Sequence, residues 1–193
     1  MMFPVVIGSL GFLCYFAYDI NSITKNNRFL QKGFLFGTLL VAIGTLGMLV
    51  GEWNHICWTF VSTYIFILVS IVMFGLLIYT LFFALTFQST YVEESCQRIA
   101  YTEGVYALCR HPGVLWYAGM YIGIAGMTGS WKSIIQGMIF ILWNVLYIAL
   151  QDRVIFPKTF TNYNEYKKTT PFLIPNKKSV EKCFKTIKKG GHV

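Results

Sequence analysis

The chain has 193 residues, of which 55% are hydrophobic and only 12% are charged, and its mean hydropathy is +0.56. Soluble domains carry about 25% charged residues, so this composition excludes the ordinary soluble class and predicts an integral membrane protein. The formal net charge of +8 is informative through its placement along the chain. We expect the partner to be a lipid bilayer and expect no nucleic-acid partner.

Five apolar segments follow one another along the chain. A helix needs about 20 apolar residues to cross the hydrocarbon layer of a bilayer. The segments predict an all-α protein with about five transmembrane helices, over residues 2–20, 33–51, 58–87, 113–129 and 131–150. Almost no loop separates the last two segments, so they are predicted to form a tight helical hairpin.

The polar segments complete a single membrane domain that spans 1–193. Residues 1–87 are a transmembrane scaffold, 88–175 hold the candidate catalytic region, and 176–193 are a basic tail. The tail has two interpretations, a solvated end or a juxtamembrane helix held by anionic lipid. Pairs of glycines four residues apart, such as Gly33 and Gly37 or Gly119 and Gly123, allow close helix contacts within one bundle or between two copies. The oligomeric state stays open.

Lysine and arginine divide unevenly between the two predicted sides of the membrane. With five spans, 15 of the 16 basic residues fall on one side, and Lys132 is the exception. The positive-inside rule assigns the basic side to the cytoplasm. The N-terminus is therefore predicted to lie outside and the C-terminus in the cytoplasm, in a bacterial cell membrane or a eukaryotic endoplasmic reticulum.

Charged residues stand at the start of the fourth apolar segment, in the stretch RHPGVLWYAG (110–119). Pro112 suits the first turn of a helix because its missing N–H is not needed there. Arg110 and His111 then lie beside free backbone N–H groups that favour an anion. The alternative is an arginine that reaches lipid headgroups, with a histidine that caps a local group.

A second polar group follows the fifth segment. Asp152 ends that segment, and a hairpin would bring it back beside Arg110 and His111. Tyr163 and Tyr166 share one face of a short helix. An acid that faces a basic pair at the membrane rim predicts a polar ligand site. An interfacial helix with a belt of aromatic residues is the alternative for the tyrosines.

Taken in order, these motifs resemble the isoprenylcysteine carboxyl methyltransferase family and the related membrane phospholipid methyltransferases. The resemblance covers residues 100–175, whereas the first 87 residues match only as generic membrane helices. Its first part is the pattern G-x-Y-x-x-x-R-H-P-x-x-x-x-x-G, and its last part is Y-x-x-Y-x-x-x-x-P-x-x-x-P. The matching residues are Gly104, Tyr106, Arg110, His111, Pro112, Gly119, Tyr163, Tyr166, Pro171 and Pro175.

The resemblance implies an S-adenosylmethionine-dependent methyltransferase with a lipophilic or prenylated acceptor in the membrane and a C-terminal segment that covers the cofactor on the cytosolic side. It implies no metal. Catalytic roles would fall to Arg110, His111 and Asp152. The cofactor-binding residues would be Tyr106, His111, Pro112, Gly119, Asp152, Tyr163 and Tyr166. The sequence departs from the family where a Glu-Glu pair is replaced by Gln151-Asp152.

Two other functions remain open. Membrane reductases of the steroid or sterol type, which use NADPH, have a similar plan but lack this Arg-His-Pro motif. A non-catalytic membrane subunit that kept the fold is the third possibility, because one carboxylate of the family pair is missing.

Overall fold

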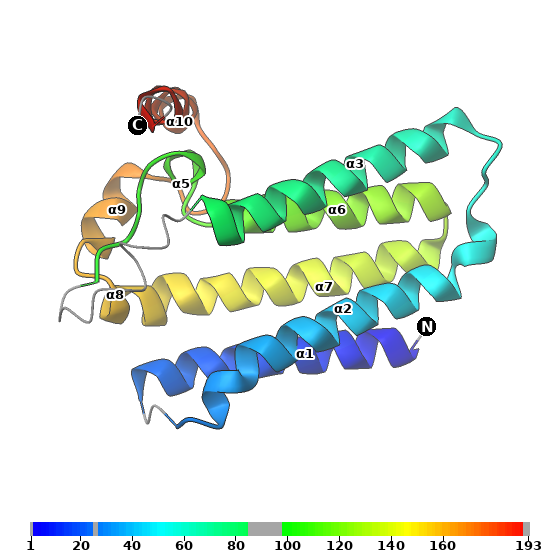
Figure 1. Cartoon of the computed structure of the whole chain (residues 1–193), viewed down its shortest axis with the longest axis horizontal. Coiled ribbons are helices and arrows are strands. Elements are labelled where there is room, and N and C mark those ends of the chain that lie inside the picture. Colours follow the sequence, from blue (N-terminus) through cyan, green and yellow to red (C-terminus); the bar gives the residue numbers. More distant parts are fainter. Residues whose placement is uncertain (1, 25–26, 85–97, 191–193) are drawn as a thin grey trace.

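The protein is an all-helical bundle whose long helices run along one common axis (Figure 1). The computed structural model describes residues 2–24, 27–84 and 98–190, and no strand occurs among them. Residues 88–97 of the predicted catalytic region, and the end of the predicted third span, lie outside these ranges. The five long helices are α1 (Met2–Ile23), α2 (Gly33–Gly51), α3 (Val61–Ile78), α6 (Pro112–Thr128) and α7 (Trp131–Leu150).

Four helical stretches are long and apolar enough to cross a membrane, namely Met2–Ile23, Leu30–Gly51, Val61–Phe83 and Trp131–Thr159. The prediction of membrane helices is confirmed at this level. Helix α6 has 17 residues and is about 25 Å long at 1.5 Å per residue. It is shorter than a typical span, yet it lies alongside α3 and α7 within the bundle (Figure 1).

Helices α6 and α7 form the predicted hairpin. Gly129 ends α6 with a positive φ of 59°, a conformation that glycine adopts without steric cost. Ser130 then caps α7, because its side chain accepts a hydrogen bond from the backbone N–H of Lys132 (3.3 Å). Two residues therefore reverse the chain and return Asp152 to the end of the bundle where α6 begins.

Aromatic side chains fill the core between the helices. Phe12 of α1 stacks on Trp143 of α7, and Tyr121 of α6 meets Phe140 of α7 edge to face. Large apolar side chains also cover much of the outer surface of α1, α2 and α3. Exposure of these apolar side chains to water is unfavourable, whereas exposure to hydrocarbon is not. The outer surface therefore fits a lipid environment.

The glycine pairs pack inside the bundle. A Cβ at Gly37 would lie 2.7 Å from the backbone oxygen of Gly11, so α1 and α2 approach closely at that point. A Cβ at Gly123 would lie 2.9 Å from the backbone oxygen of Phe66 in α3. These two glycines therefore serve contacts within one chain.

The remaining helices gather at one end of the bundle, on the left in Figure 1. They are the short α5, α8 and α9, followed by the longer α10. Two π-helical turns, η3 (Tyr79–Phe83) and η4 (Gln151–Ile155), extend α3 and α7 toward the same end. The bounds of the four helices are Val105–Leu108 for α5, Phe156–Thr159 for α8, Tyr163–Thr169 for α9 and Lys177–Gly190 for α10.

Candidate functional site

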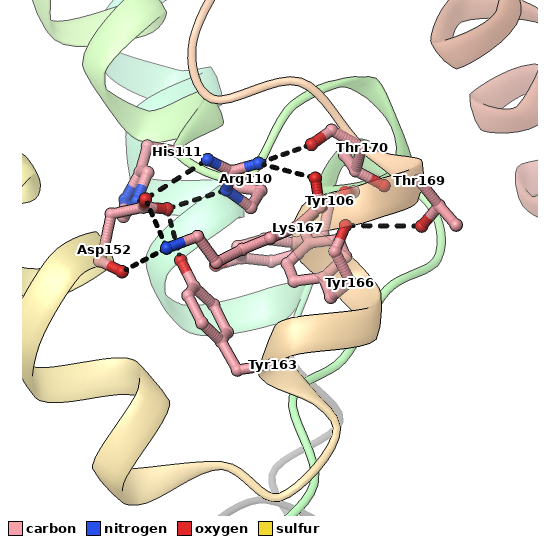
Figure 2. A network of polar contacts seen from close by, with 9 residues as sticks. All are labelled: Tyr106, Arg110, His111, Asp152, Tyr163, Tyr166, Lys167, Thr169 and Thr170. Atoms are coloured by element: carbon pink, nitrogen blue, oxygen red, sulfur yellow. Dashed lines mark hydrogen bonds and ion pairs between the residues drawn. The ribbon is translucent and has the colours of Figure 1, made fainter.

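Arg110 is the centre of a buried polar cluster between α5, α6, η4 and α9 (Figure 2). Its backbone N–H donates to the carbonyl oxygen of Pro171 (2.9 Å). Its guanidinium Nε donates to Oδ1 of Asp152 at 2.7 Å, and Nη2 donates to Oδ2 of the same residue at 3.2 Å. The pair is bidentate, the geometry in which arginine binds a carboxylate most strongly.

The third guanidinium nitrogen of Arg110 holds the C-terminal segment. Nη1 donates to the backbone oxygen of Thr170 at 2.6 Å and to that of Lys167 at 3.3 Å. The guanidinium carbon also lies 5.7 Å from the ring centre of Phe172. One side chain thus ties the start of α6 to the end of α7 and to the segment after α9.

Asp152 lies in the π turn η4 and faces several donors. A π turn changes the direction in which successive side chains point, and such turns are frequent at functional sites. Besides Arg110, the hydroxyl of Tyr163 donates to Oδ1 of Asp152 at 2.6 Å, and Nζ of Lys167 lies 3.6 Å from Oδ2. These partners stabilise the ionised form of the carboxylate. Both of its oxygens already contact donors of the same chain.

His111 is buried between two phenylalanine rings. It stacks on Phe156 at 5.7 Å and meets Phe172 edge to face at 5.3 Å. Burial lowers the pKa of His111 below its usual value, although Asp152 opposes that shift. The imidazole is therefore neutral near pH 7.

The Nε2 atom of His111 has no hydrogen-bond partner among the described residues. It lies 3.5 Å from Oδ1 of Asp152, an electrostatic contact without the geometry of a hydrogen bond. A buried polar atom without a partner is costly. This nitrogen and Oγ1 of Thr170, a second buried atom of the cluster without a hydrogen-bond partner among the described residues, are therefore the two atoms that a bound ligand could satisfy.

The two tyrosines of α9 fasten the C-terminal segment. Tyr163 donates to Asp152, and Tyr166 donates to the backbone oxygen of Tyr106 in α5 at 2.6 Å. Tyr106 in turn donates from its hydroxyl to the backbone oxygen of Thr80 in η3 at 3.0 Å. Burial raises the pKa of Tyr163 and of Tyr166, so both phenols stay neutral and act as donors.

The structure brings together all but one of the residues predicted for the site. The cluster contains Tyr106, Arg110, His111, Pro112, Asp152, Tyr163 and Tyr166, with Pro112 as the buried first residue of α6. Gly119 lies two turns along α6, where a Cβ would meet the Sδ atom of Met73 at 2.8 Å. Its position fits helix packing, and its predicted contact with a cofactor stays a prediction.

Sequence reasoning did not find Asp19 in α1. Its Oδ2 atom accepts a hydrogen bond from Nε2 of Gln151 at 2.9 Å, directly beside Asp152. The side chain is buried, and none of the ion pairs among the described residues includes it. An acidic residue within an apolar helix indicates a candidate functional site. This pattern in the sequence could have identified Asp19.

Two depressions open on the surface of the described chain. One has a volume of about 380 Å³ and is lined by Pro171, Phe172, Leu173 and Ile174, next to the ring that contacts His111. The other, of about 450 Å³, is more polar and lies between the end of α1 and Arg98, with Tyr18, Asn21, Ser22 and Gln31 as its other walls.

Cys109, which precedes Arg110, is fully buried, and burial raises the pKa of its thiol to about 11. A thiol in that state is mostly protonated at neutral pH and is a poor nucleophile. Its position fits packing.

Comparisons with known proteins give no relative for this chain. No family model matches it, and no curated protein and no solved structure matches it either.

Proposed function

We propose that the protein is an S-adenosylmethionine-dependent methyltransferase that acts on a lipophilic acceptor in the membrane. The observation that carries the proposal is the meeting of three distant segments in one buried cluster. Residues 106–112, Asp152 and the segment 163–171 carry the motifs that resemble the methyltransferase family, and they meet at the end of an apolar bundle.

The cluster fits a bound cofactor in one specific respect. The neutral imidazole of His111 has a buried Nε2 atom that lacks a hydrogen-bond partner in the described chain, and a cavity of about 380 Å³ begins beside Phe172, which contacts that imidazole. S-adenosylmethionine, when bound, supplies an activated methyl group. His111, with Phe172 and the segment after α9, would hold it and exclude water.

The protein residues contribute mainly alignment. Methyl transfer from a sulfonium is an in-line displacement, and orientation of two reactants contributes about 7–11 kcal/mol. A carboxylate acceptor needs no base. An amine or hydroxyl acceptor loses a proton, and the neutral His111 is the base that this cluster offers. In this proposal Asp152 acts by holding Arg110 and Tyr163 in place.

The proposed arrangement in the membrane has five spans, with α6 as the fourth and the site in the cytoplasm. It is supported by the distribution of basic residues. The end of α1, the start of α2, the end of α3 and the start of α6 lie at the end of the bundle that holds the cluster, whereas α7, with Lys132 as its second residue, begins at the opposite end (Figure 1). The N-terminus is then outside.

A non-catalytic membrane subunit is the second candidate, and one observation favours it. The carboxylate of Asp152 is engaged by Arg110, Tyr163 and Lys167, and Gln151 is engaged by Asp19. These bonds suffice to explain both residues as structural parts of the fold.

A thermal-shift measurement tests these candidates. Purified protein is expected to be stabilised by S-adenosylhomocysteine and not by NADPH, because a ligand that binds only the folded state raises Tm. His111→Gln should lose the shift, and Glu165→Gln, which changes an exposed side chain of α9, should keep it. Stabilisation by NADPH alone would favour a reductase, and no shift with either ligand would favour the non-catalytic subunit.

A further inference from the structure

Helix α10 (Lys177–Gly190) has 14 residues and lies across the bundle. Figure 1 shows it end-on, whereas the five long helices run along the horizontal axis of the view. If the bundle axis follows the membrane normal, then α10 lies parallel to the membrane plane. It also lies at the end of the bundle where most basic residues are found.

One narrow strip of α10 is covered by the rest of the protein. Ser179 and Cys183 are buried there, and the hydroxyl of Thr186 accepts a hydrogen bond from the backbone N–H of Gly104 at 2.9 Å. These three residues follow one another at helical spacing on a single face. Helix α10 packs through this face on α5, the helix that leads directly to Arg110.

The apolar face of α10 is wider than the strip that α5 covers. Phe184 and Ile187 belong to that face, and they remain 63% and 50% exposed. In water, exposed apolar side chains on a short helix of this kind are unfavourable. A bilayer interface would accommodate them, because interfacial helices bury such side chains at the boundary between headgroups and acyl chains.

The opposite face of α10 is strongly basic. The helix contains six lysines and one glutamate, and Lys177, Lys178 and Lys185 are exposed. A face rich in lysine beside a face with phenylalanine and isoleucine is the composition of a helix that binds an anionic membrane surface. Anionic lipids attract basic residues that lie near the membrane surface.

We propose that α10 is an interfacial anchor that binds the anionic lipid surface of the membrane that the bundle crosses. Phe184 and Ile187 enter the headgroup boundary, and the exposed lysines contact lipid phosphates. Because α10 packs on α5, this anchor also supports the chain segment that carries Arg110. The proposal is independent of the reaction that the site performs.

Amide hydrogen exchange on the full-length protein in nanodiscs tests the proposal. One set of discs contains phosphatidylcholine alone, and the other also contains phosphatidylglycerol. The amides of 177–187 should exchange on the order of tenfold more slowly in the anionic discs, since several lysines contribute attraction. High salt should remove most of this difference, because it screens exposed charges.

Two variants and a matched control sharpen the test. Replacing Lys177, Lys178 and Lys185 by glutamine should abolish the dependence on lipid charge, whereas Phe184→Ser with Ile187→Ser should speed exchange in both discs. The control replaces three exposed lysines outside α10, namely Lys32, Lys158 and Lys168, and should keep the dependence.

Equal exchange of the wild-type protein in the two discs would overturn the proposal and point to water or another protein as the partner of this face. The proposal would also be overturned if the control variant lost the dependence on lipid charge to the same extent as the variant with three lysines replaced in α10. Peptides of α7, measured in the same samples, show whether each variant keeps the bundle folded.

Discussion

Replacing Asp152 by asparagine should destabilise the protein strongly. Asparagine has nearly the same shape, but it removes the negative charge that Arg110 binds through two nitrogens, at 2.7 and 3.2 Å. The side chains of Arg110 and Asp152 are only 9% and 7% exposed. Water therefore cannot replace the lost partner, and the guanidinium is left buried beside a neutral amide.

The size of the effect follows from this burial. Removing one partner of a buried ion pair costs about 3–5 kcal/mol. For chains of this length, 1 kcal/mol corresponds to a change in Tm of about 2–4 °C. Asp152→Asn should therefore lower Tm by at least about 6 °C, and the chain after α9 should loosen first, because Arg110 and Tyr163 connect it to Asp152.

Glu165→Gln is the matched control, because Glu165 and Lys168 form an ion pair of similar length, 2.6 Å, that is 73% and 69% exposed. Exposed pairs contribute only about 0–1 kcal/mol, so Tm should change by about 4 °C or less. The assay is thermal unfolding of both variants in the same detergent, with limited proteolysis of the C-terminal segment. Equal shifts in Tm for the two variants would refute the reasoning from burial.

Two further outcomes follow from the same cluster. Asp19→Ala and Gln151→Ala should each lower Tm, and the double variant should lower it by less than the sum of the two single shifts, because both changes remove the same 2.9 Å hydrogen bond; additive shifts would contradict this. The lowered pKa of His111 keeps it neutral in the folded state, while the unfolded chain takes up a proton below about pH 6.5. Stability should therefore fall as pH falls below that value, by more in the wild-type protein than in His111→Gln, and identical pH profiles of Tm would be evidence against a buried neutral imidazole.

Much of the fold could be predicted because hydrophobicity and charge act over whole segments. Apolar runs of about 20 residues predict membrane helices without knowledge of their partners. The two-residue turn at Gly129 and the helix start at Pro112 depend on local backbone chemistry, and both are visible in the sequence. Together they define a helical hairpin, and a hairpin was enough to predict that Asp152 returns to Arg110.

Other parts of the cluster could not be predicted, because they depend on the register of helices that are distant in sequence. The pairing of Asp19 with Gln151 requires α1 to pack beside α7 with a particular rotation. The π turn η4 adds one residue to a helical turn, and no simple pattern in the sequence marks it. The contact of Lys167 with Asp152 depends in turn on the direction in which η4 points that carboxylate.

The arrangement of bonds around Arg110 suggests why charged residues occur at the end of an apolar bundle. Hydrophobic contacts help to hold the C-terminal segment, since Tyr163 and Tyr166 are buried against Phe156 and Phe160, but such contacts are not directional and do not by themselves fix one geometry. Directional bonds can do so, and Arg110 uses all three of its guanidinium nitrogens, toward Asp152, Lys167 and Thr170. The same bonds leave His111 buried beside this segment, with Nε2 at 3.5 Å from Oδ1 of Asp152 and without a hydrogen-bond partner among the described residues. The ion pair thus serves to position the segment, and His111 is the residue whose replacement should affect binding more than folding.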